Sequence, residues 1–185
     1  MEVSSDAPEP FLTDARTLRK RVRRHIDDGA ATVPHSAYRD TVLQLLNDSL
    51  ATEIVCVLRY QRYQFLADGI HSNGIAEEFV AHASEEQGHA DQIAERIAQL
   101  GGEPDFSMDG LISHGHAECV EGKSILDLVK HDMISECLAM DGYRDFLRYL
   151  GDYDLATRQM IEEILAAEKH HGTEMAELLE GMTDK

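Results

Sequence analysis

Two short motifs in this sequence carry side chains that bind transition metals. Each has the form Glu-x-x-His: Glu86 with His89, and Glu168 with His171. Residues three apart project from the same side of an α-helix, so each motif presents a carboxylate and an imidazole together. A single motif of this kind arises often by chance and is typical of a solvated pair. Two copies in one chain favour a metal site.

Single glutamates and tyrosines repeat with the same spacing as the two motifs. Glu53 lies 33 residues before Glu86, and Glu136 lies 32 residues before Glu168. A tyrosine follows each of these first glutamates by seven residues, at Tyr60 and Tyr143. Each tyrosine is either a core side chain or a hydrogen-bond donor to a ligand carboxylate. The chain therefore reads as two copies of one metal-binding hairpin.

The glutamates and histidines of both copies occupy helix positions where leucine would be expected. Buried carboxylates without partners would cost roughly several kcal/mol each, so a counter-charge is needed. Two divalent cations would balance four carboxylates, and oxygen-rich ligands with two imidazoles suit iron or manganese. The pattern predicts a dinuclear, catalytic metal centre formed by Glu53, Glu86, His89, Glu136, Glu168 and His171.

Four long helices are expected to position these residues. The four prolines stand at positions 8, 10, 34 and 104, which leaves long stretches free of the strongest helix breaker. Apolar residues recur there with helical spacing. Residues typical of helix ends bound the predicted helices: Asp68–Gly69, Ser72–Asn73, Gly101–Gly102, Ser124, Gly151, Asp154 and Gly181.

The connections predict how the helices are arranged. Each helix of about 27–32 residues is roughly 40–48 Å long, and short links make the first two and the last two helices antiparallel hairpins. Residues 103–123 are enough to run the length of the bundle. The predicted fold is all-α, a ferritin-like four-helix bundle over residues 36–182 with one long crossover between helices two and three. Residues 1–35 are expected to form an extension with a short amphipathic helix.

The segment SEEQGHADQIAERIAQLGGEP resembles the second-helix signature of bacterioferritins, and the resemblance covers about residues 36–182. It implies a chain of the ferritin-like superfamily, bacterioferritin or Dps-like. Its metal ligands would form three sets, with Glu53 and His89 terminal on one metal, Glu136 and His171 terminal on the other, and Glu86 and Glu168 bridging.

The resemblance also implies a function. The chain would be a ferroxidase that holds two Fe ions per subunit, with Mn possible, oxidises Fe(II) with dioxygen or hydrogen peroxide, and stores iron in a homo-oligomeric shell. Bacterioferritins bind haem through a methionine that is Gln87 here, so haem is not expected. Only fourteen residues follow His171, too few for a fifth helix, and a Dps-like dodecamer is expected.

Two other functions stay open. One is a manganese catalase or a peroxide-reducing di-metal enzyme. The other is a DNA-protecting protein, because residues 16–25 hold six lysines and arginines. Six acids balance them within residues 1–38, and Leu18, Val22 and Ile26 recur every four residues, which favours a docked helix over a DNA arm. The net charge of −18 repels nucleic acid and anionic membranes.

The sequence also supports expectations for the cellular location of the protein and for four further residues. With no long uncharged apolar run and no secretory signal pattern at the N-terminus, the chain is expected to be cytoplasmic. Cys119 and Cys137 are either a pair near the site or, as we expect, buried free thiols. Asp132 is expected to face solvent rather than orient a ligand, and His82 to be a solvent or core histidine.

Overall fold

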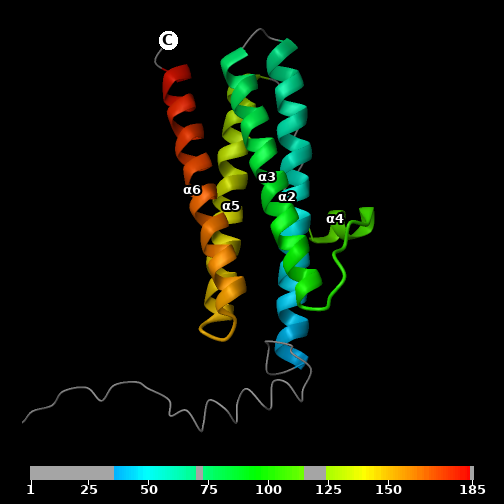
Figure 1. The fold of residues 1–185 in the computed structure, drawn as a ribbon. Coiled ribbons are helices and arrows are strands. Elements are labelled where there is room, and N and C mark those ends of the chain that lie inside the picture. The colour runs from blue at the N-terminus through cyan, green and yellow to red at the C-terminus, as the bar shows by residue number, and fades with distance from the viewer. Residues whose placement is uncertain (1–35, 70–72, 115–123, 184–185) are drawn as a thin grey trace, which may run out of the picture.

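Four long helices form a bundle in the computed structural model, which describes residues 36–69, 73–114 and 124–183 (Figure 1). They are α2 (Ser36–Gly69), α3 (Asn73–Gln99), α5 (Ile125–Leu150) and α6 (Leu155–Thr183). The described part of the chain has no strands. The all-α, four-helix prediction is confirmed. The extension predicted over residues 1–35, with its short helix, lies outside the described residues.

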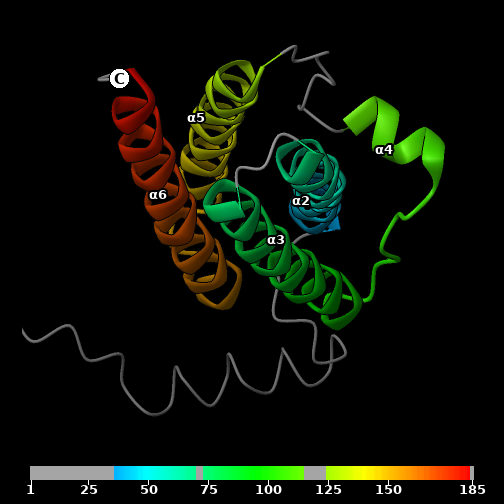
Figure 2. The same ribbon diagram turned by 90° about the horizontal axis from the view of Figure 1, so that it is seen from above.

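The helices follow the predicted one-crossover order. Short links join α2 to α3 and α5 to α6 as antiparallel hairpins, and α3 and α5 both run from the top of the bundle to the bottom (Figure 1). A short helix within the crossover, α4 (Met108–His114), lies outside the bundle beside α2 (Figure 2). Sequence patterns had not located it, because seven residues are too few to reveal a helical period.

The helix ends carry the caps that the sequence predicts. Ser124 accepts a hydrogen bond from the Asp127 N–H at the start of α5, and the Gly151 N–H bonds to the Leu147 carbonyl at its end. Gly101 follows α3 with a φ of 71°, a left-handed conformation that favours glycine. One expected end is wrong: Gly181 does not close α6, which continues to Thr183.

The core consists of two apolar clusters with a band of charged side chains between them. One cluster includes Leu46 of α2 and Ile93 of α3, and the other includes Tyr60 of α2 and Phe79 of α3. Glu53 lies between the two α2 positions in sequence and is 1 % exposed. The apolar clusters therefore hold the helices together on both sides of the charged band.

Residues 38–67 of α2 are long and apolar enough, by composition alone, to cross a membrane. Their arrangement is that of a core helix in a bundle. Leu46, Leu50 and Tyr60 are fully buried within the protein, and Glu53 and Arg59 are buried on the same helix.

Candidate metal centre

The six predicted ligands meet in the charged band at the middle of the bundle. Each of the four long helices supplies at least one of them. Five are at most 1 % exposed and His89 is 8 % exposed. The structure thus brings together the whole predicted set: Glu53, Glu86, His89, Glu136, Glu168 and His171.

The six side chains form two overlapping groups. One contains Glu53 and His89, the other contains Glu136 and His171, and both contain Glu86 and Glu168. Within each group the ligand atoms lie within 4.8 Å of one another. This is the geometry of two adjacent cation positions that share two carboxylates.

The two shared carboxylates each send one oxygen toward each histidine. Glu86 Oε2 lies 3.2 Å from His89 Nδ1, while its Oε1 lies 3.4 Å from His171 Nδ1. Glu168 Oε1 lies 3.2 Å from His89 Nδ1, while its Oε2 lies 3.9 Å from His171 Nδ1. Both carboxylates therefore span the space between the imidazoles, as bridging ligands must.

Several atoms that line this space are buried and have no hydrogen-bond partner within the described part of the chain. They are Glu53 Oε2, Glu86 Oε1, Glu136 Oε2, Glu168 Oε1 and His171 Nδ1. Buried polar atoms are otherwise nearly always paired, because an unpaired one costs about 1–3 kcal/mol. Lone pairs directed at a common space fit two hard or borderline divalent cations, so the donor set suits iron or manganese.

In the metal-free protein, protons balance part of the negative charge of the carboxylates. Burial and the neighbouring Glu86 charge raise the pKa of Glu53 well above its usual range. Burial disfavours the charged form of Glu86 too, but hydrogen bonds from its neighbours outweigh burial and lower its pKa. The carboxylates likewise outweigh burial at the histidines, and raise the pKa of His89 to about 12 and that of His171 to about 10. Cation binding must therefore displace protons.

The two tyrosines cross between the halves of the bundle. The Tyr60 hydroxyl, on α2, donates to Glu136 of α5, and the Tyr143 hydroxyl, on α5, donates to Glu53 of α2. Of the two interpretations left open, both hold: each tyrosine is a core side chain, at most 3 % exposed, and each donates to a carboxylate of the centre. Each therefore orients the carboxylate of the opposite repeat.

Asp132 and Arg59 form a buried pair beside Glu136. The expectation that Asp132 faces solvent is wrong: it is 0 % exposed, and its Oδ2 lies 3.0 Å from the Tyr60 hydroxyl, whose single proton it shares with Glu136. Burial raises its pKa to about 8, although Arg59, with Nε 3.4 Å away, favours the charged form. Sequence reasoning missed Arg59, since arginine on a long helix is usually exposed.

The cysteines differ from expectation. Cys137 is exposed on α5, so its predicted burial is wrong, and Cys119 lies outside the described residues. Cys56 is the buried free thiol, and Arg59 Nη2 donates to its sulfur at 3.2 Å.

Two residues of α3, Glu85 and His82, lie next to His171. Glu85 places its Oε2 2.8 Å from His171 Nε2, on the side of the ring away from the centre. His82 is a core histidine, one of the two alternatives expected for it, and its ring stacks on His171 at 4.2 Å. The spacing of Glu85, next to the motif glutamate, offers no signal for this contact.

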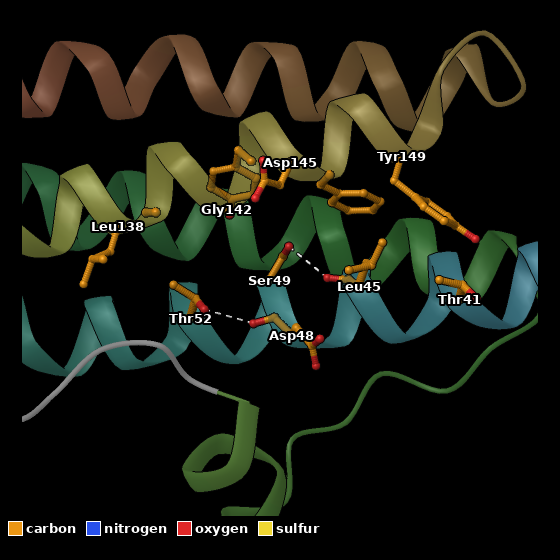
Figure 3. Close-up of a pocket in the computed structure, with 12 residues that line it drawn as sticks. Thr41, Leu45, Asp48, Ser49, Thr52, Leu138, Gly142, Asp145 and Tyr149 are labelled. Carbon is orange, nitrogen blue, oxygen red and sulfur yellow. Dashed lines mark hydrogen bonds between the residues drawn. The ribbon is translucent and has the colours of Figure 1, made fainter.

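A hollow of about 390 Å³ opens between α2 and α5 (Figure 3). Leu45 and Ser49 line it on α2, and Leu138 and Tyr149 line it on α5. Tyr143 also lines it and separates it from Glu53. The hollow thus comes within one side chain of the centre.

Comparison with known proteins agrees with this fold. Residues 43–184 match the family model described as Ferritin-like domain. The chain is 27 % identical to a bacterioferritin of Desulfovibrio desulfuricans over 133 residues, 71 % of this chain and 70 % of that protein. It is 25 % identical to a DNA protection during starvation protein of Brevibacillus brevis over 139 residues, 73 % of this chain and 93 % of that one.

Solved structures share the fold. The Desulfovibrio desulfuricans bacterioferritin, described with a diiron site, superposes with a TM-score of 0.72 and 23 % identity over 80 % of this chain and 83 % of that one. A dodecameric thioferritin, the bacterioferritin-related protein of Bacteroides fragilis, gives 0.74 and 23 % over 79 % and 88 %. Because the family model covers most of the sequence, this chain belongs to the ferritin-like family.

Proposed function

We propose that this chain is a ferroxidase that oxidises Fe(II) with dioxygen or hydrogen peroxide at the carboxylate centre. It stores the Fe(III) product in the cytoplasm, inside a shell of identical subunits. The observation that carries the proposal is the pair of shared carboxylates, Glu86 and Glu168, each with one oxygen toward each histidine. Relatives named bacterioferritin support the same activity.

Each side chain of the centre has a distinct role in this proposal. Glu86 and Glu168 would hold both cations, Glu53 and His89 would complete one position, and Glu136 and His171 would complete the other. Two bound iron ions would supply one electron each, which with two protons turn dioxygen into hydrogen peroxide, or hydrogen peroxide into two waters. The hydrogen bonds of the tyrosines keep the end carboxylates directed at the cations, and the apolar clusters keep bulk water out.

Removing a shared carboxylate tests the proposal. Glu86→Ala and Glu168→Ala should each slow Fe(II) oxidation, followed by stopped-flow absorbance, at least about tenfold, since each loses an oxygen ligand to both cations. Glu163→Ala, at an exposed site on the same helix as Glu168, is the matched control and should oxidise Fe(II) like the wild type. Wild-type rates in both Glu86→Ala and Glu168→Ala would refute the assignment.

The same donor set also suits manganese, so a manganese catalase or another peroxide-reducing enzyme is the competing activity. Metal analysis of protein purified from iron-replete cells separates the two. The ferroxidase requires iron as the dominant metal and Fe(II)-dependent oxygen or peroxide consumption. Manganese as the dominant metal, with peroxide turnover that needs no Fe(II), would support the catalase instead.

A DNA-protecting role is a second candidate, because one relative is named a DNA protection during starvation protein. The net charge of −18 opposes DNA binding, and the basic run at residues 16–25 lies outside the described residues. A gel-shift assay at low and moderate salt decides the matter, since phosphate contacts weaken steeply with salt. We expect no shift at moderate salt.

A further inference from the structure

A second group of metal-binding side chains lies on the seam between α3 and α6, outside the dinuclear centre. It consists of Glu78 and His82 of α3 and Glu174 of α6. One ligand atom from each of the three lies within 4.8 Å of the others, and His82 Nε2 is 2.9 Å from Glu174 Oε2. None of these residues belongs to the six ligands of the centre.

The His82 imidazole is held rigidly at this seam. Its side chain is 2 % exposed, stacks on the His171 ring at 4.2 Å and meets the Tyr60 ring edge-on at 5.2 Å. Its Nδ1 is buried and has no hydrogen-bond partner among the described residues. The other ring nitrogen, Nε2, faces Glu174 Oε2 and is the one placed to bind an ion together with that carboxylate.

The two carboxylates of the group, Glu78 and Glu174, are partly exposed to solvent and can therefore be reached by ions. Glu78 is half-buried, and the Glu174 side chain is 33 % exposed. Two carboxylates this close repel each other unless a positive charge lies between them. One imidazole nitrogen and two carboxylate oxygens are the ligands that Fe(II), Mn(II) and Zn(II) accept.

A hollow of about 440 Å³ gives access to the group from outside the bundle. Glu78, Glu174 and Glu177 line it together with Leu178 and Met182, and its described lining has no lysine or arginine. A concave, acidic wall of this kind concentrates cations. One helical turn further along the seam, Glu85 contacts His171, a residue of the dinuclear centre.

We propose that Glu78, His82 and Glu174 form a third divalent-cation site, between the outer hollow and the dinuclear centre. The site is separate from the centre because no ligand is shared. It rests on the proposed function only for the identity of the ion, which would then be incoming Fe(II). Its side chains would bind Co(II) or Zn(II) in the same way.

Cobalt(II) binding without oxygen, measured by equilibrium dialysis, tests the site. The double variant Glu78→Gln/Glu174→Gln should bind one Co(II) fewer per chain than the wild type. The amide oxygen that Glu174→Gln introduces can still accept the His82 hydrogen bond, so this substitution keeps the ring in place. Glu177→Gln removes one charge from the same hollow but no proposed ligand, and should bind as many ions as the wild type. Equal Co(II) stoichiometry and affinity in the double variant and the wild type would overturn the proposal.

A third variant separates this inference from the proposed ferroxidase. Glu86→Ala/Glu168→Ala should lose the two central ions and keep the third. Suppose that Glu78→Gln/Glu174→Gln binds one Co(II) fewer than the wild type, while Glu86→Ala/Glu168→Ala binds as many as the wild type. That result would support the third site and contradict the dinuclear centre. Loss of all the ions in Glu86→Ala/Glu168→Ala would overturn a site that is independent of the centre.

Discussion

Two tyrosine hydroxyls determine how the end carboxylates of the centre are held. Tyr143 is buried and donates to Glu53, so Tyr143→Phe leaves a buried carboxylate oxygen without its donor. We expect this variant to lower the free energy of unfolding of the metal-free protein by about 1–3 kcal/mol. The midpoint of urea unfolding at fixed protein concentration measures the loss.

Tyr149→Phe is the control for that substitution. Tyr149 lies on the same helix, its side chain is 42 % exposed, and its ring stacks on Tyr38 without reaching the centre. Its free energy of unfolding, from the same urea experiment, should stay within about 0.5 kcal/mol of the wild-type value. Equal effects of the two substitutions would mean that the Tyr143 hydroxyl does not support Glu53.

The metal-free protein should lose stability as the pH rises. Asp132, His171 and His89 have pKa values raised to about 8, 10 and 12. A group whose folded-state pKa is raised stabilises the fold below its unfolded pKa, and this contribution disappears as the pH rises through the folded pKa. All three groups therefore lower the stability from pH 6.5 to about 8, and the two histidines continue to lower it up to pH 10.

Melting curves of the metal-free and Zn(II)-loaded protein across that pH range check this effect. The melting temperature of the metal-free protein should fall from pH 6.5 to 10. The Zn(II)-loaded protein should lose less, because cations replace the protons that balance the carboxylates. A melting temperature that rises with pH without metal would contradict the charge balance derived for the centre.

Residues that interrupt the apolar periodicity of a helix could be predicted from the sequence, whereas residues whose burial depends on helix packing could not. Glutamate and histidine at leucine positions are visible in the periodicity, which is why the six ligands could be predicted. The burial of Asp132 and Arg59 could not, because a charged residue on a long helix is exposed by default. Which carboxylate each tyrosine contacts was also hidden, since it depends on the helices that face one another.

At the scale of elements, the start of α6 relies on one buried aspartate. Asp154 accepts from the Thr157 N–H at 3.1 Å and from Arg96 of α3 at 2.9 Å, so it caps α6 and ties the two hairpins together. Asp154→Ala should lower the free energy of unfolding by about 1–3 kcal/mol. Asp152→Ala, an exposed neighbour in the same turn, should be nearly neutral in the same thermal or urea unfolding experiment.

The pH dependence of this cap has the opposite sign to that of the centre. Burial opposes the charge of Asp154, but hydrogen bonds from Thr157 and Arg96 outweigh burial and lower its pKa. A lowered pKa gives stability that is present above the unfolded value of about 3.8 and is lost as the pH falls through the folded pKa. The difference between wild type and Asp154→Ala should therefore shrink in acid; a constant difference would contradict the role of the carboxylate charge.

Helix boundaries were the most predictable feature at this scale. Ser124, Gly101 and Gly151 cap the helices where the sequence places them, because capping depends on residues close together in the chain. Gly181 failed as a helix end, since a glycine near a terminus stops a helix only when it adopts a left-handed conformation. The helix α4 was missed because it is too short to have a period.

At the scale of the whole molecule, storage requires a closed shell whose interior collects cations. We expect such a shell to contain twelve identical subunits. Twelve chains of 20.7 kDa give a particle of about 250 kDa. Light scattering coupled to size-exclusion chromatography measures this mass. A particle with the mass of a monomer or dimer would contradict iron storage in a shell and would support a redox enzyme that forms no shell.

Anomalous diffraction from crystals soaked in Fe(II) tests the dinuclear centre most directly. We predict two iron peaks inside each bundle, about 3.5–4 Å apart, as in two-metal sites. One peak should lie between Glu53 and His89, the other between Glu136 and His171, with Glu86 and Glu168 touching both. A single peak, or no iron among these six residues at full soaking, would contradict the account.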